Sequence, residues 1–168
     1  MAIKHSHIIL PLVVAIAMLL SGCGSSGCLE NRTSIPQAVF YAYNHPSQKV
    51  SVDSISVYGV GQWNDSLLLD CAKKVTTLDL PFRNNTDTTQ YVIRYDARAL
   101  ALPQYNDTLT FIYRRHPYFI SGDWGVVFNY YIDAVDYTRN VLDSVALVNK
   151  EVNNKEQETL RIYYYVAE

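Results

Sequence analysis

The chain has 168 residues, with 16 acidic and 14 basic side chains and a formal net charge of −2 at pH 7. Because there is no surplus of basic residues to neutralise phosphates, this composition argues against nucleic acid as a partner. The length fits one domain that is large enough to bury a proper hydrophobic core.

The first 22 residues are typical of an export signal. Lys4 precedes an apolar run at residues 8–20, which has no charged side chain. As a helix this run would span about 20 Å, whereas the hydrocarbon core of a membrane is roughly 30 Å thick. The sequence therefore predicts a cleaved signal peptide rather than a permanent helical anchor.

The motif Leu20-Ser21-Gly22-Cys23 ends this segment. It resembles the lipobox of bacterial lipoproteins, in which the thiol of the cysteine is acylated and the chain is cleaved before it. That resemblance implies two or three acyl chains on Cys23, palmitate among them, which suffice for stable anchoring. The alternative is an ordinary secretory signal in which Cys23 occurs by chance.

Three parts of the chain follow from this interpretation. We expect a signal peptide at residues 1–22, a lipidated Cys23 with a flexible tether at residues 23–34, and a single domain at residues 35–168. The expected location is the bacterial cell envelope, in the outer membrane facing the periplasm, with the cell surface as the alternative.

Alternation of apolar and polar residues predicts β-strands in the mature part. Three sets of apolar residues each share one face: Tyr91, Ile93 and Tyr95; Leu109, Phe111 and Tyr113; Leu160, Ile162, Tyr164 and Val166. Further strands are expected at residues 37–43, 50–58, 66–70, 75–80, 126–132 and 141–148. A change of apolar phase at Asp53-Ser54 indicates a β-bulge there.

Turn signals separate these runs, among them Arg83-Asn84-Asn85-Thr86 and Ser121-Gly122-Asp123. About nine short strands with frequent turns are typical of an antiparallel β-sandwich, of immunoglobulin-like or jelly-roll type. The predicted fold class is therefore all-β.

Two cysteines remain after lipidation of Cys23. Cys28 and Cys71 would lie in a compartment that permits disulfides, and a bridge would close a loop of roughly 44 residues, worth about 4 kcal/mol. The alternative is two unpaired thiols. The remaining histidines, His45 and His116, are not at ligand spacing from a cysteine or from each other, so neither a metal nor a cofactor is expected.

The sequence contains none of the common catalytic motifs, such as a G-x-S-x-G elbow, a P-loop or H-E-x-x-H. His45 and His116 each lie beside a proline in a predicted loop. Asp123, Asp133 and Asp136 are candidate carboxylates for glycoside hydrolysis, but turns and strand ends explain them without chemistry. We therefore expect that the protein is not an enzyme.

Five of the 11 aspartates precede Ser or Thr and then an apolar residue or Thr. The hydroxyl residues of these triplets are Ser54, Ser66, Thr88, Thr108 and Ser144. The structural explanation is that Asp-Ser and Asp-Thr serve turns and strand starts through side-chain to backbone bonds. The functional alternative is O-glycosylation, because the triplets resemble an acceptor motif of exported proteins in gut Bacteroidota.

Aromatic residues near the C-terminus allow a binding role. Arg161, Tyr163 and Tyr165 fall on the strand face opposite Leu160, and Trp63 and Trp124 lie beside predicted turns. Exposed rings can stack against sugars or anchor another protein. The alternative is that tyrosine is simply a good strand former.

Several short motifs carry a resemblance to a known family. They are Asn31-Arg32-Thr33, Asp53-Ser54-Ile55, Gly59-Val60-Gly61, Asp65-Ser66-Leu67-Leu68-Leu69-Asp70, Leu78-Asp79-Leu80-Pro81 and Asp107-Thr108-Leu109-Thr110. In these the chain resembles an uncharacterised family of Bacteroidota lipoproteins, a domain of unknown function of roughly this length. The resemblance implies an exported lipoprotein with a β-rich domain and brings no known activity.

Together these observations predict a lipid-anchored envelope protein with a non-catalytic β-sandwich in a binding or structural role. Its expected partners are the membrane and either an envelope protein or a glycan. The alternatives are a surface adhesin or fimbria-like subunit, for which residues 160–166 would be the exchangeable edge strand, and a glycan-binding module.

Overall fold

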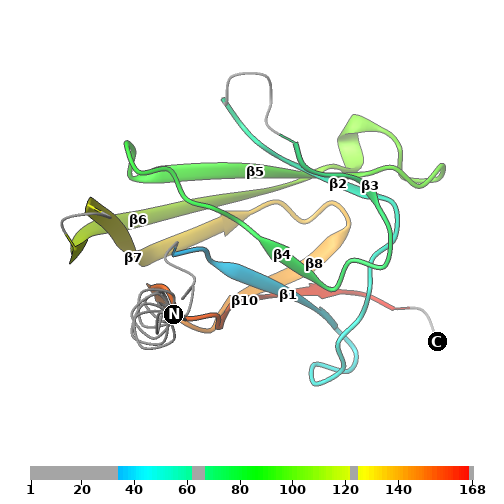
Figure 1. The fold of residues 1–168 in the computed structure, drawn as a ribbon. Coiled ribbons are helices and arrows are strands. Elements are labelled where there is room, and N and C mark those ends of the chain that lie inside the picture. Colours follow the sequence, from blue (N-terminus) through cyan, green and yellow to red (C-terminus); the bar gives the residue numbers. More distant parts are fainter. Residues whose placement is uncertain (1–33, 62–66, 122–124, 167–168) are drawn as a thin grey trace, which may run out of the picture. The chain divides into compact units, whose positions relative to one another are not determined.

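The computed structural model in Figure 1 describes residues 34–61, 67–121 and 125–166. Within these ranges no helix is long and apolar enough to cross a membrane. The predicted signal peptide, Cys23, the tether and Cys28 lie outside the described residues, as do Trp63, Ser66 and Trp124.

Two β-sheets form the domain. The first contains, in spatial order, β4 (Thr77–Asp79), β1 (Gln37–Ala42), β10 (Glu158–Tyr164) and β8 (Leu142–Leu147). The second contains β3 (Leu67–Ala72), β2 (Ile55–Gly59), β5 (Thr88–Tyr95), β6 (Asp107–Ser121), β7 (Gly125–Tyr137) and β9 (Glu151–Val152). A short 3-10 helix, η1 (Pro103–Tyr105), precedes β6.

All paired strands are antiparallel except β1 and β10, which run parallel. The sheets pack face to face, as Figure 1 shows, and the predicted all-β sandwich is confirmed. β10 lies between β1 and β8, so the C-terminal strand is internal to its sheet and is not a free edge.

The predicted alternation places the core correctly. Ile93, Phe111 and Ile162 are fully buried, together with their neighbours two positions away along each strand. Aromatic rings join the layers: Phe40 of β1 meets Tyr164 edge-on, with 5.3 Å between ring centroids. Val166 is exposed because β10 ends two residues before it.

The run at residues 50–58 differs from its prediction. Lys49 bridges Tyr41 and Val52 bridges Val75, both beside the first sheet, whereas β2 begins at Ile55 in the second sheet. Ser54 between them has a left-handed φ of 55°. The change of apolar phase therefore marks a crossing between sheets, and the bulge predicted at Asp53-Ser54 is wrong.

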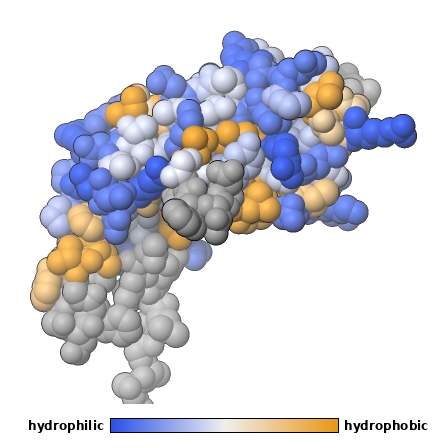
Figure 2. Space-filling view, turned by 90° about the horizontal axis from the view of Figure 1, so that it is seen from above, coloured by the Kyte–Doolittle hydropathy of each residue, from blue (hydrophilic) through white to orange (hydrophobic). Residues whose placement is uncertain are grey.

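β6 and β7 are longer than predicted, and they form a hairpin that continues past its neighbours. The last pair between β5 and β6 joins Thr88 and Ile112, and β9 meets β7 at Tyr130 and Tyr131. Beyond these pairs the hairpin is a two-stranded ribbon among the described residues. Its connected end lies at the left of Figure 1, and hydrophobic residues gather at that side in Figure 2.

Candidate functional site

A cavity lies beside this ribbon, and we refer to it as the hairpin cavity. It has a volume of about 680 Å³. One wall is the loop between β4 and β5, residues 81–86, and the other is the start of β7, residues 126–130. Ser34 and Gly61 complete its described lining.

Aromatic side chains line the inner part of the cavity. Phe82 stacks on Tyr113, with ring centroids 4.2 Å apart, and meets Tyr130 edge-on at 5.3 Å. Because side chains alternate along β7, Phe128 shares the face of Tyr130 and Ile132. Ile132 is fully buried in the core, whereas Phe128 is only half-buried and faces the cavity. The hairpin cavity is thus an open continuation of the hydrophobic core.

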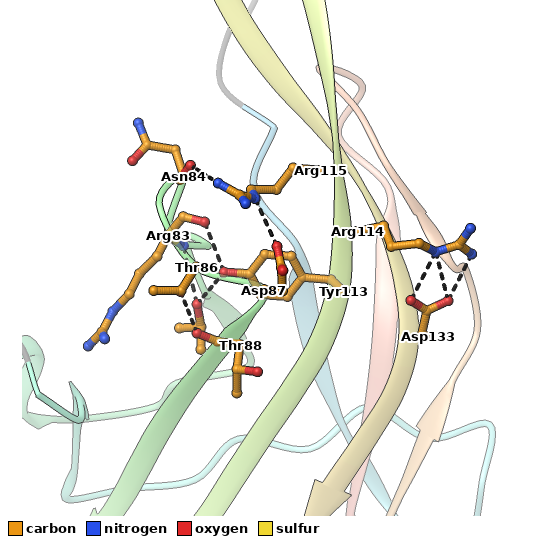
Figure 3. Close-up of polar contacts among 10 residues, drawn as sticks. Arg83, Asn84, Thr86, Asp87, Thr88, Tyr113, Arg114, Arg115 and Asp133 are labelled. Atoms are coloured by element: carbon orange, nitrogen blue, oxygen red, sulfur yellow. Dashed lines mark hydrogen bonds and ion pairs between the residues drawn. The ribbon is translucent and has the colours of Figure 1, made fainter.

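Hydrogen bonds from buried hydroxyls fix the polar wall. The Tyr113 hydroxyl donates to the Arg83 carbonyl at 2.9 Å, and the Arg83 amide donates to Thr89 Oγ1 at 3.2 Å. The two hydroxyls are themselves 2.7 Å apart. Thr86 Oγ1 donates to the Thr88 carbonyl at 2.7 Å, as Figure 3 shows. The backbone of the loop is therefore held in place without help from the Arg83 side chain.

Arg83 supplies a cation to the cavity lining. Its Nη2 donates to the Val60 carbonyl, and its Nε is buried without a hydrogen-bond partner. Among the described residues no carboxylate forms an ion pair with it. Gly61 beside it adopts a left-handed φ of 69°, a conformation that favours glycine. The guanidinium therefore has donor capacity and positive charge left for a ligand.

Two other arginines near the cavity differ from Arg83. Arg115 donates to Asp87 Oδ1 at 3.0 Å and to the Asn84 carbonyl at 2.6 Å. Arg114 forms a two-pronged ion pair with Asp133, which raises the pKa of Arg114. Figure 3 shows the Arg115–Asp87 pair between the loop and β6, and the Arg114–Asp133 pair on the side of β6 away from the loop. Each of these cations is already matched by a carboxylate.

The predicted glycosylation sites are dispersed over the domain. Thr88 is exposed at the start of β5, whereas Ser54, Thr108 and Ser144 are half-buried. Ser66 lies outside the described residues. No two of the described sites share a cavity.

Two aspartates of these triplets have a structural task. Asp107 is fully buried, and its carboxylate accepts backbone N–H groups from the β7–β8 connection. Asp53 Oδ1 accepts the Lys74 amide at 2.6 Å. The structural explanation accounts for these two triplets, and glycosylation stays a prediction.

The residues considered for other chemistry lie apart from one another. Cys71 is exposed and has a left-handed φ of 44°. Its predicted pairing with Cys28 stays a prediction, because Cys28 lies outside the described residues. His45 lies in a turn, but His116 lies within β6, so its predicted loop position is wrong. In the described part of the chain no three His, Cys, Asp or Glu side chains are placed to hold a metal ion.

The remaining candidate residues either contact other side chains or lie away from the hairpin cavity. Asp133 and Asp136 are exposed on β7, and Asp123 lies outside the described residues. On the C-terminal strand face, Arg161 pairs with Glu158, and Tyr163 packs near Tyr41 with ring centroids 6.0 Å apart. Tyr165 is exposed. Arg161 and Tyr163 thus meet around Tyr41, over whose ring the Arg161 guanidinium lies at 4.9 Å, whereas Asp133 and Asp136 lie in the other sheet.

Sequence reasoning missed the hairpin cavity. Residues 83–86 are predicted as a turn, which is correct, but their opposition to Phe128 depends on a contact between distant parts of the chain. The only local signal is Arg83 followed by two asparagines, Asn84 and Asn85, in a predicted turn.

Comparisons with known proteins give one match. Residues 54–164 match a family of unknown function, DUF6452. No curated protein and no solved structure matches the chain.

Proposed function

The chain belongs to this family of unknown function, and we propose that it is a lipid-anchored protein of the Bacteroidota cell envelope with a non-catalytic, ligand-binding β-sandwich. Anchoring is supported by the apolar run before Leu20-Ser21-Gly22-Cys23. The outer membrane, facing the periplasm, is the proposed location, and the cell surface is the alternative. The binding role rests on the hairpin cavity.

One observation carries the binding role: the Arg83 guanidinium lines a cavity of about 680 Å³ without a carboxylate partner among the described residues. A guanidinium left without an anion is suited to a carboxylate or phosphate on a ligand. The half-buried ring of Phe128 offers an apolar platform in the same cavity.

A glycan is the ligand class that this lining favours. The side chains of Asn84, Asn85 and Thr86 offer amide and hydroxyl groups, which suit sugar hydroxyls. An aromatic ring can stack on the apolar face of a sugar. Together with Arg83, these groups fit an oligosaccharide that bears a carboxylate.

Binding without hydrolysis is supported by the acid residues nearby. Glycoside hydrolysis needs two carboxylates that face the same bond. None of the described residues lining the hairpin cavity is Asp, Glu or His. Asp87, just before β5, pairs with Arg115, and Asp133, in β7, pairs with Arg114.

The adhesin or fimbria-like alternative has less support. It requires an exposed strand that another subunit can pair with or replace. Of the segment expected to serve, residues 160–166, the part up to Tyr164 lies in β10, which pairs with β1 on one side and with β8 on the other. The glycan-binding role is therefore the better supported alternative.

A glycan array tests the cavity. The probes are neutral oligosaccharides and matched ones that carry uronic or sialic acid, applied to the wild type, Arg83→Met and Phe128→Ala. We expect Arg83→Met to weaken binding of the acidic probes by about tenfold or more, since loss of a charge-assisted bond is worth roughly 1.5–3 kcal/mol.

The matched control is Arg139→Met, because Arg139 is exposed and pairs with Asp143 away from the cavity. It should bind the acidic probes like the wild type, and circular dichroism should show that every variant is folded at the temperature of the array. Absence of glycan binding by the wild type, or equal binding by Arg83→Met, would contradict the cavity as a glycan site.

Fatty-acid labelling tests the anchor separately. Labelled palmitate should enter the wild-type protein and not Cys23→Ala. Equal labelling of the two proteins would contradict lipidation at Cys23 and leave the cavity experiment unaffected.

A further inference from the structure

The connected end of the β6–β7 hairpin carries apolar side chains on both faces. Phe119 lies opposite Val126, and Tyr118 lies opposite Val127. Directly opposed residues share a face, and consecutive residues point to opposite faces. Tyr118, Phe119 and Val126 are 56%, 63% and 55% exposed, respectively. Each face of this ribbon end therefore carries an exposed aromatic side chain, whereas Val127 is half-buried and lines the hairpin cavity together with Val126.

The two strands of this apolar end, residues 117–121 and 125–128, contain no charged side chain, and Asp123 in the connection between them lies outside the described residues. Other exposed large apolar residues, such as Leu102 and Val148, occur singly, which is ordinary for a soluble surface. A contiguous exposed apolar group is not ordinary, and it marks an interaction site. Figure 2 shows hydrophobic residues at the side where Figure 1 places the hairpin end.

An apolar ribbon with exposed side chains on both faces fits a lipid surface better than it fits a flat protein surface. A flat protein surface covers one face of a two-stranded ribbon and leaves the other in water, whereas lipid surrounds both. The open edges of the ribbon have backbone groups that need hydrogen bonds, so deep insertion into hydrocarbon is costly. A shallow position, about 5–10 Å into the boundary between headgroups and acyl chains, avoids that cost. Tyrosine, as at Tyr118, is typical of this boundary.

Two cationic residues follow directly behind the apolar end. Arg114 and Arg115 lie shortly before Pro117 on β6, and the Arg114 side chain is 61% exposed. At about 3.3 Å per residue, Arg115 lies roughly 13 Å from Phe119, which is the level of the phosphates when the end is shallowly inserted. The exposed ion pairs of these arginines are weak enough to be shared with phosphate oxygens.

The chain enters the domain beside the hairpin. Ser34 Oγ donates to Asn129 Oδ1 at 2.9 Å, and Asn129 pairs with His116 across the ribbon. Ten residues lie between Cys23 and Ser34, so the Cα atoms of these two residues are at most about 40 Å apart. A lipid on Cys23 would keep the apolar end within this reach of the membrane.

We propose that the β6–β7 hairpin end, with Tyr118, Phe119, Val126 and Val127, docks shallowly into a lipid surface. This inference rests on the proposed membrane anchoring, which supplies the surface. The hairpin cavity then lies close to the membrane, at the base of the inserted end.

Spin-label accessibility tests this docking on the full chain. Phe119→Cys and Val148→Cys are each made with Cys28→Ser and Cys71→Ser, and the proteins are added to excess vesicles of phosphatidylethanolamine with phosphatidylglycerol. Val148 is the matched control because it is an apolar residue with 51% exposure, beyond the end of β8. The protein with Cys28→Ser and Cys71→Ser alone serves as the blank, because it shows how much label reacts with Cys23.

We expect the label at position 119 to be relaxed by oxygen and protected from a water-soluble nickel chelate, with an oxygen-to-nickel ratio several-fold above that at position 148. Without vesicles the two positions should respond alike. Equal ratios in the presence of vesicles would place the hairpin end in water and overturn the proposal. Protection of position 119 from both reagents would show a protein cover and overturn it as well.

The anchor and the docking fail in different ways. A failed anchor appears as equal fatty-acid labelling of the wild type and Cys23→Ala. The accessibility at position 119 in added vesicles reports the hairpin end alone. Failure of the anchor therefore does not imitate failure of the docking.

Discussion

The Tyr95 hydroxyl donates a hydrogen bond of 2.9 Å to Asp107 Oδ2 in the buried core. The same carboxylate accepts the amides of three consecutive residues, Asn140, Val141 and Leu142, at 2.7, 3.0 and 2.9 Å. One side chain at the start of β6 thus fixes the path of the chain from β7 to β8. These bonds satisfy a charge that would otherwise be costly to bury.

Replacement of this carboxylate by an amide is expected to destabilise the domain strongly. In Asp107→Asn, an NH2 group replaces one acceptor and faces backbone N–H donors. Leaving buried donors unsatisfied costs about 1–3 kcal/mol each, so we expect a loss of about 3 kcal/mol or more in the free energy of unfolding. Urea denaturation followed by circular dichroism measures it.

The matched control is Asp143→Asn, whose carboxylate lies 3.4 Å from an exposed Arg139. It should change stability little, because water screens such a pair. A loss in Asp107→Asn no larger than in the control would show that the buried carboxylate is not essential to the fold.

Two buried tyrosines predict how stability depends on alkaline pH. The hydroxyls of Tyr95 and Tyr164 are 3.1 Å apart and join the two sheets. Burial raises the pKa of both phenols above the ordinary value of 10. In the unfolded chain these groups ionise near pH 10, whereas in the folded domain they do not. Their contribution to stability is therefore complete below about pH 10 and is lost as the pH rises further.

Tyrosinate absorbance recorded with circular dichroism checks this prediction. The buried phenols should ionise only together with loss of the strand signal. Ionisation of every tyrosine in one reversible step, with the fold retained, is the contrary result.

Parts of the fold could be predicted where the pattern that specifies them lies within one strand. The alternation through Tyr91, Ile93 and Tyr95 identifies β5 because one face of that strand is buried. The run at residues 50–58 alternates on both sides of Asp53-Ser54, and its change of phase there fits a bulge as well as a crossing between sheets. The bridge of Val52 to Val75 and the pairing of β2 with β5 identify the crossing.

The length of β6 was underestimated for a different reason. Proline lacks a backbone donor and usually marks the end of a strand, which placed His116 in a loop. Pro117 instead lies in the ribbon, where β7 is the only described neighbour of β6 and the other edge needs no donor. The hairpin cavity stayed hidden because its walls, at Arg83 and Phe128, meet only in the folded domain.

Glu158 predicts a dependence of stability on acid pH. Burial alone would raise the pKa of its carboxyl group, but hydrogen bonds from Arg161 and Tyr41 outweigh burial and hold the pKa below its ordinary value. Since the folded pKa lies below the unfolded one, the contribution is present at neutral pH and is lost as the pH falls through the folded pKa.

Urea denaturation of the wild type and Glu158→Gln measures this contribution between neutral pH and about pH 3. The wild type should be the more stable protein at neutral pH, and the difference should shrink in acid. It should be small, because Glu158 and Arg161 are partly exposed and water screens their pair. A difference that grows in acid would reverse the sign of the argument.

Thr88 is the described triplet residue best placed for O-glycosylation. It is exposed at the start of β5, and Asp87 before it is exposed and pairs with Arg115. Thr108, by contrast, is half-buried behind the fully buried Asp107. A transferase can reach Thr88 on the folded surface, so any sugar on these two residues is expected on Thr88.

Intact mass of the protein from its native host checks this expectation. Thr88→Val should remove the added mass, Thr108→Val should keep it, and a block of export should abolish it in the wild type. Thr108→Val is the matched control because it makes the same change in another Asp-Thr triplet. An unmodified mass of the exported wild type would contradict glycosylation at Thr88. The Asp-Thr pair at residues 87–88 would then need only the structural explanation that accounts for Asp107.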